Sequence, residues 1–270
     1  MKTSTSISSK IVSLFSIILL VALIALVSYQ KQDPQIYPTI KDISTCFINN
    51  ITSKDTILNF IYTFLRLFGV LVVSLIISLI IALLYYYNRL IMSFLRPIII
   101  IMKASPLVAV AIYIFIIIRG SSAHIIRPML ICFLVTMPVM LEATIASIDN
   151  MDQNIVLELH VTDASKWAKF IKIYLPLMFP SIVTCLLQTI GLGFKVMVTG
   201  EYLCQVRRSV GLMIYSSFSI LDMANLIAII IEIVIIVIIG ESIIKYWCFK
   251  LPRGWGCRKR QKSRGLSTKK

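Results

Sequence analysis

The chain has 270 residues, of which 58% are hydrophobic and 14% charged, and its formal net charge is +15. A soluble domain carries about 25% charged residues, so most of this chain is expected to lie in lipid. The length suits one membrane domain, and the positive charge gathers at the edges of apolar runs and in the C-terminal tail. That placement indicates orientation in a bilayer rather than nucleic-acid binding.

Six apolar runs are long enough to cross the hydrocarbon core, which takes about 20 residues of helix. They are Ile11–Ser28, Ile57–Tyr86, Ile98–Ile118, Pro128–Ile148, Leu177–Thr199 and Met223–Ile244. None alternates in the manner of a barrel strand, so the predicted fold class is all-α, a bundle of about six transmembrane helices. Lys2 and Lys10 before the first run also fit a signal peptide, and we favour a retained helix.

The basic residues predict how the bundle is oriented. With both termini in the cytoplasm, 18 of the 27 lysines and arginines lie inside and seven outside, and the other two fall within spans. This bias follows the positive-inside rule and predicts a multi-pass protein of the cell (cytoplasmic) membrane. The expected organisation is a membrane helix and external loop in 1–56, a transmembrane domain in 57–248, and a basic, disordered cytoplasmic tail in 249–270.

The polar segment 149–175, between the fourth and fifth runs, has a helical pattern of its own. Apolar residues recur in it at i, i+3, i+4 and i+7, namely Ala164, Trp167, Ala168 and Ile171. Three lysines lie beside this stripe, namely Lys166, Lys169 and Lys172. Asp163 is placed to cap the helix, and Pro176 suits the first turn of the next one. The pattern fits both a helix on the membrane surface and a helix in the groove of a cytoplasmic partner.

This loop resembles the E-A-A loop of ATP-binding-cassette (ABC) importer permeases, which reads E-A-A, three residues, G, nine residues, I, one residue, L-P. The positions of that motif are taken here by Leu157, Glu158, Leu159, Asp163, Ile173, Leu175 and Pro176. Glu158 stands one place from the expected glutamate, and Asp163 replaces the glycine. The second half of the loop therefore carries most of the resemblance.

Other segments match the same family in order, namely Thr63–Arg66 with Gly69, Arg96–Pro97, Ser105–Pro106, Gly191–Glu201 and Ser209–Leu212. The similarity covers about Ile57 to Lys245 and looks most like the nitrate, sulfonate, taurine and thiamine-precursor branch. It implies a permease for a small anionic or polar organic solute.

The same resemblance implies partners. They would be a second permease copy, an extracytoplasmic solute-binding protein, and a dimer of ATPase subunits that docks on loop 152–175, including Ala164, Lys166 and Trp167. The chain contains no G-x-x-x-x-G-K-[ST] phosphate loop, so ATP is expected on the separate subunit. No cofactor is expected on this chain.

Charged residues stand in or near the apolar runs, where an unpaired charge is costly. They are Arg66, Glu142, Lys195, Glu201, Glu232 and Glu241. Arg66 and Glu142 are candidates for a pair between helices, and Glu201 is expected at the membrane interface. Lys195 is a candidate for attracting an anionic solute, with snorkelling or pairing to another helix as the alternative.

Small residues in the fifth run, namely Gly191, Gly193 and Gly200, are interpreted chiefly as close-packing positions, with a hinge or pathway wall as the alternative. Glu241 and Lys245 have the i, i+4 spacing of a helix-stabilising pair.

Two other classes stay open. A membrane-embedded enzyme acting on a lipid-linked substrate would use intramembrane acids such as Glu142 and Glu201. Its catalytic or metal-binding signature is missing from the sequence, because the six cysteines form no C-x-x-C pair. A structural or decayed permease homologue would keep the fold without transport.

Overall fold

The computed structural model of the chain describes residues 38–120, 122–151 and 165–250. Every regular element in these ranges is a helix, which confirms the all-α fold class. In chain order the elements are α2 (Ile40–Thr52), α3 (Lys54–Tyr87), α4 (Leu90–Ala104), α5 (Leu107–Ile117), α6 (Ala123–Asp149), α8 (Lys166–Lys169), the π-helix η1 (Phe170–Tyr174), α9 (Leu175–Cys204), α10 (Val210–Ser219) and α11 (Met223–Lys250). The first predicted span and the basic tail from residue 251 lie outside the described residues.

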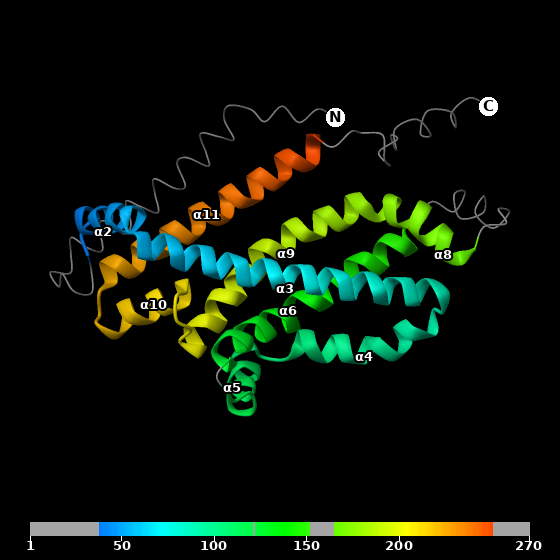
Figure 1. Ribbon diagram of the computed structural model, residues 1–270, viewed down its shortest axis with the longest axis horizontal. Helices are drawn as coiled ribbons and strands as arrows, with labels where there is room; N and C mark the ends of the chain where they lie inside the picture. Colours follow the sequence, from blue (N-terminus) through cyan, green and yellow to red (C-terminus); the bar gives the residue numbers. More distant parts are fainter. Residues whose placement is uncertain (1–37, 121, 152–164, 251–270) are drawn as a thin grey trace, which may run out of the picture.

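Four long apolar helices form the membrane-crossing part of the described chain, so the protein is a multi-pass membrane protein. They are α3, α6, α11 and the helix that contains α9, and they confirm four of the predicted spans. The helix α6 packs against both α3 and α9, and Figure 1 shows these three running along the length of the molecule. The helix α11 packs on α2, α9 and α10, and its C-terminal part stands apart from the bundle in Figure 1.

The predicted third span, Ile98–Ile118, is wrong as a single helix. It is split into α4 and α5, which are bent by 99° at the break. Ser105 and Pro106 both have extended backbone angles, because a proline disfavours the helical conformation in the residue before it and has no N–H for a helical bond. At 15 and 11 residues, neither helix alone reaches the roughly 20 residues of a crossing, but together they are long and apolar enough for a fifth, broken span.

Two helices occupy segments that the sequence analysis treated as external loops. Thr39 begins α2 with a capping box, in which its side chain accepts from the Asp42 N–H and the Asp42 carboxylate accepts from the Thr39 N–H. Ser209 begins α10 by accepting a hydrogen bond from the Leu212 N–H at 3.0 Å. Both helices lie at the end of the bundle opposite α8 (Figure 1), and we call these the α10 end and the α8 end.

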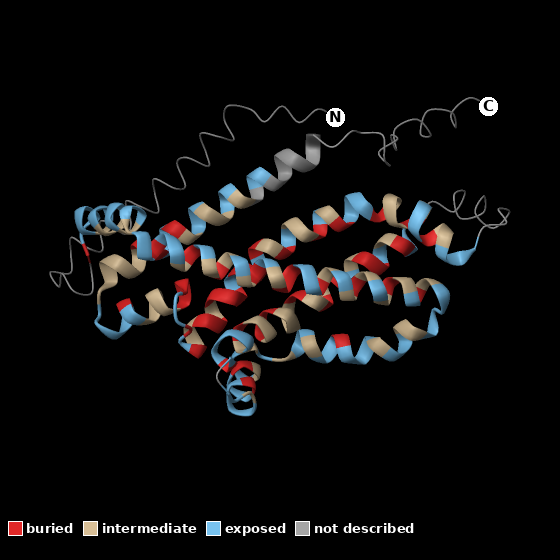
Figure 2. Ribbon diagram, viewed as in Figure 1, coloured by how far each residue is buried: buried red, intermediate tan, exposed pale blue. Residues whose placement is uncertain are grey.

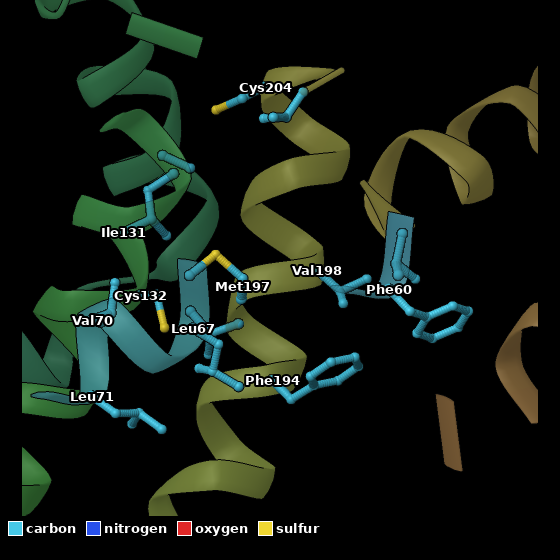
Figure 3. Packing of buried hydrophobic residues seen from close by; sticks show 14 of the residues in the cluster. Phe60, Leu67, Val70, Leu71, Ile131, Cys132, Phe194, Met197, Val198 and Cys204 are labelled. Atoms are coloured by element: carbon cyan, nitrogen blue, oxygen red, sulfur yellow. The ribbon is translucent and has the colours of Figure 1, made fainter. Parts of the chain in front are cut away.

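The core lies where α3, α6 and α9 meet. Figure 3 shows side chains of all three helices directed into it, among them Leu67, Cys132 and Met197. A Cβ on Gly193 would lie 3.0 Å from Leu67 Cδ1, and one on Gly200 would lie 3.2 Å from Pro128 Cα. The close-packing interpretation of these two glycines is therefore confirmed. Figure 2 shows buried residues on the inward faces and exposed residues on the outward faces of the long helices.

Candidate functional site

The α8 end carries the described part of the polar segment. Ser165 caps the helix there, because its side chain accepts from the Ala168 N–H at 3.3 Å. The predicted helix through Trp167 and Ile171 is confirmed from Lys166 onward. Five of the predicted loop residues lie outside the described ranges, namely Leu157, Glu158, Leu159, Asp163 and Ala164.

The helix that begins at Lys166 does not stop before the membrane span. It continues through η1 as one apolar helix of 39 residues to Cys204, and Pro176 lies in the first turn of the α9 part, as predicted. The turn before Pro176 is a π-helix in which the Leu175 N–H reaches back to the Phe170 carbonyl. Because Pro176 has no N–H and its ring crowds the carbonyl four residues back, this wider turn lets the helix pass through the proline without breaking.

An aromatic cluster fixes this segment to the end of α3. The Tyr86 ring lies 4.6 Å from the Tyr174 ring and 5.7 Å from the Phe170 ring, measured between centroids. Phe170 and Tyr174 are buried, and Trp167 is 54% exposed. Next to the cluster the Tyr85 hydroxyl donates to Asp149 at 2.8 Å, which ties α3 to α6. The inward face of the segment is thus packed, and the outward face is open.

A buried charged pair joins α3 and α9 towards the α10 end. Arg66 donates to Glu201 Oε1 at 2.7 Å, and the Thr63 hydroxyl donates to Glu201 Oε2 at 2.8 Å. Glu201 is completely buried among the helices, three residues before α9 ends at Cys204. The predicted pairing of Arg66 with Glu142 is wrong, because a carboxylate on a neighbouring helix satisfies Arg66 instead.

The same pair holds the loop that leads into α10. Arg66 also donates to the carbonyls of Arg207 at 3.3 Å and Arg208 at 3.2 Å. The Val210 N–H donates to Thr63 Oγ1 at 3.1 Å. The sequence analysis missed this role of Thr63, although a threonine one helical turn before an intramembrane arginine is a signal that was available.

Glu142 pairs with Lys103 of α4, whose Nζ lies 2.7 Å from Oε2. Both side chains are about half exposed, 46% for Lys103 and 44% for Glu142. Lys195 is exposed as well. The described chain contains two ion pairs, Arg66–Glu201 and Lys103–Glu142, and Lys195 belongs to neither.

The two acids named for the membrane-enzyme alternative belong to separate ion pairs. Glu142 pairs with Lys103, and Glu201 pairs with Arg66. The two carboxylates therefore do not form a pair for acid–base catalysis. Within residues 38–120, 122–151 and 165–250 no group of three His, Cys, Asp or Glu side chains is placed to hold a metal ion. The α8 end combines a packed inner face with exposed apolar side chains, Trp167 and Ile171.

The family comparison agrees with this reading. The family model described as "Binding-protein-dependent transport system inner membrane component" matches residues 74–247, which is more than half of the chain. No curated protein matches the chain.

Proposed function

Since the chain belongs to the family of binding-protein-dependent transport system inner membrane components, we propose that it is the permease subunit of an ABC importer. It carries a small anionic or polar organic solute across the cytoplasmic membrane, as in the nitrate, sulfonate and taurine branch. Two copies of the chain form the pathway, a dimer of ATPase subunits supplies the energy, and an extracytoplasmic binding protein delivers the solute.

The observation that carries the proposal is the two-sided helix at the α8 end. Trp167 and Ile171 are exposed at i, i+4 spacing, whereas Phe170 and Tyr174 are buried against α3. Lys166 flanks the exposed pair and lies over the Tyr87 ring at 5.8 Å. An amphipathic helix with an exposed apolar face is the form that fits a hydrophobic groove on a partner.

The connection to the membrane supports the same proposal. Because residues 166–204 form one helix, a force applied at Trp167 is transmitted to the core without passing through a flexible linker. Through the rings of Tyr86, Phe170 and Tyr174, the same force is transmitted to α3. ATPase closure then pulls on the 152–175 loop, and the helices expose the pathway first on one side and then on the other.

The test is the double substitution Trp167→Glu with Ala168→Glu. Two carboxylates on the docking face oppose burial in an apolar groove, so the variant is expected to lose its ATPase subunit. The measurement is the amount of co-purified polypeptide containing G-x-x-x-x-G-K-[ST] per permease chain, taken from native membranes. Equal permease levels in the membrane fraction show that insertion is intact.

The matched control is Ile220→Glu. Ile220 is also an exposed apolar residue, at 75%, but it follows α10 at the opposite end of the bundle. The control is expected to keep its ATPase subunit. A parental ATPase ratio in the Trp167–Ala168 variant overturns the docking proposal.

A further inference from the structure

One face of α9 is both exposed and polar. The residues on it are Ser181, Thr184, Gln188, Leu192, Lys195 and Thr199, and we call them the α9 stripe. All are exposed except Thr199, which is partly exposed, and five of the six are polar. At 100° per residue they fall within an arc of about 80°, so they line one side of the helix.

The other outward faces of the bundle are different. Between residues 65 and 84 of α3, and between residues 230 and 239 of α11, every exposed residue is apolar, for example Val72 and Val234. Those faces suit lipid tails. The α9 stripe does not, because polar side chains in hydrocarbon lose their hydrogen bonds to water.

We infer that the α9 stripe lines a water-filled path through the membrane and contacts the solute there, and that this solute is a small anion. The inference rests on the proposed transport function. It goes further by naming the wall of the path and the charge of its cargo.

Lys195 places a positive charge on the wall of the path. Neither ion pair of the described residues includes Lys195, so neither of those carboxylates neutralises its ammonium group. Its neighbours on the stripe are neutral groups that can form hydrogen bonds. The hydroxyls of Thr184 and Thr199 each donate to the helix carbonyl four residues back, at 2.8 Å, and their lone pairs stay free to accept. A single positive charge among neutral polar groups favours a small anion.

Cysteine accessibility tests whether the stripe is wet. Gln188→Cys in the full chain, in native membranes, is treated with two charged, membrane-impermeant methanethiosulfonates, one anionic and one cationic. The controls are Val72→Cys and Val234→Cys, which lie on the apolar faces, and the parent chain gives the background of the native cysteines. Gln188→Cys is expected to react with both reagents, and the controls are expected to stay at background. If Gln188→Cys reacts no faster than the controls, the inference is overturned. The same result is expected if a second copy of the chain covers the stripe, and it overturns the inference in that case too.

The ratio of the two reagent rates at Gln188→Cys tests the sign of the path. Lys195 is seven residues away, about 10 Å along the helix. Replacing it in the Lys195→Gln variant is expected to lower the anionic-to-cationic rate ratio by about two- to fourfold, the lower value applying at physiological ionic strength. Lys172→Gln, at the α8 end and beyond the screening length of about 10 Å, is expected to leave the ratio unchanged. An unchanged ratio in Lys195→Gln overturns the assignment of an anionic cargo.

These outcomes separate the inference from the proposed function, because labelling needs neither ATP nor the docked subunit. A wet stripe in a chain that never co-purifies with an ATPase contradicts the importer proposal and leaves the path standing. A dry stripe in a chain that does co-purify with one contradicts the path and leaves the importer proposal standing.

Discussion

Arg66 and Glu201 are 135 residues apart in the sequence, and their side chains meet at 2.7 Å between α3 and α9. The glutamate is fully enclosed, and the arginine side chain is 11% exposed. A buried carboxylate is tolerated when it has a cationic partner and its remaining lone pairs are satisfied. Thr63 satisfies the second oxygen at 2.8 Å, so the group is complete.

Removing one member of this group is expected to destabilise the protein strongly. Arg66→Ala leaves Glu201 buried without a cation, which costs about 3–5 kcal/mol. The double variant Arg66→Met with Glu201→Leu removes both charges and is expected to be closer to the parent chain. The midpoint of thermal unfolding in detergent measures both. A single variant as stable as the double one contradicts the burial argument.

Gly211 is predicted to tolerate no side chain. A Cβ there would lie 2.4 Å from the Tyr202 backbone nitrogen and 2.5 Å from Glu201 Cβ, so α10 would have to move away from α9. Gly211→Ala is therefore expected to lower the midpoint of thermal unfolding. Gly240→Ala is the matched control, since nothing lies within 4 Å of that position. It is expected to be neutral or to stabilise α11 by up to about 1 kcal/mol.

The thiol of Cys46 is predicted to react slowly at neutral pH. Burial in α2, with smaller contributions from Asp222 and then Asp42, raises the pKa of its thiol. A raised pKa means less thiolate, and hence slower reaction with maleimide, at neutral pH. Asp222→Asn removes the larger of the two charge effects and keeps a residue that can cap α11. The Cys46 labelling rate at pH 7.5 is expected to rise, and a lower rate contradicts the electrostatic assignment.

Glu232 is a buried acid that belongs to neither ion pair of the described residues. It is 4% exposed, and its carboxyl group lies near the Asn50 amide but forms no hydrogen bond with any of the described residues. Glu232→Leu keeps the volume and removes the desolvated polar group. We expect it to raise stability by about 1–3 kcal/mol, measured by thermal unfolding. Glu232→Lys is expected to lower it, and a destabilised leucine variant would point to a partner of Glu232 beyond the described residues.

The sequence predicts the helices that are long and predominantly apolar. For α3, α6 and α11, a stretch of about 20 mostly apolar residues has no stable alternative to a helix in lipid. It does not predict α2 and α10, because 13 and 10 residues are too short for a hydropathy criterion. The N-cap residues Thr39 and Ser209 can be recognised in the sequence, but a cap alone does not predict a helix.

The break at Pro106 shows a different limit. Apolar residues flank it on both sides, so average hydropathy favours one span, whereas the backbone angles at Ser105 and Pro106 divide it. Pro176 has the opposite outcome, since the helix is continuous from the π-turn at Phe170–Tyr174 into the first turn of α9, where Pro176 lies. A proline in an apolar run therefore marks a position of uncertainty, and the packing around it decides whether the helix breaks.

The candidate site was only half predictable. The helical spacing of Trp167 and Ile171 revealed the outward face at the α8 end. The partners of Arg66 and Glu142 were not accessible, because pairing between helices depends on their rotation and depth, which one sequence does not encode as a local pattern.

The unbroken helix from Lys166 to Cys204 also has a mechanical consequence. Its 39 residues make a lever about 58 Å long. At Gly193 it packs closely on side chains of α3 and α6, namely Leu67 and Thr136, and this contact lies 27 residues from one tip and 11 from the other. For a helix that turns there as a rigid body, the arms are about 40 and 17 Å, so a displacement of about 5 Å at the Lys166 tip corresponds to about 2 Å at the Cys204 tip. In such a rotation, a large displacement at the α8 end corresponds to a small displacement, with a proportionally larger force, at the α10 end.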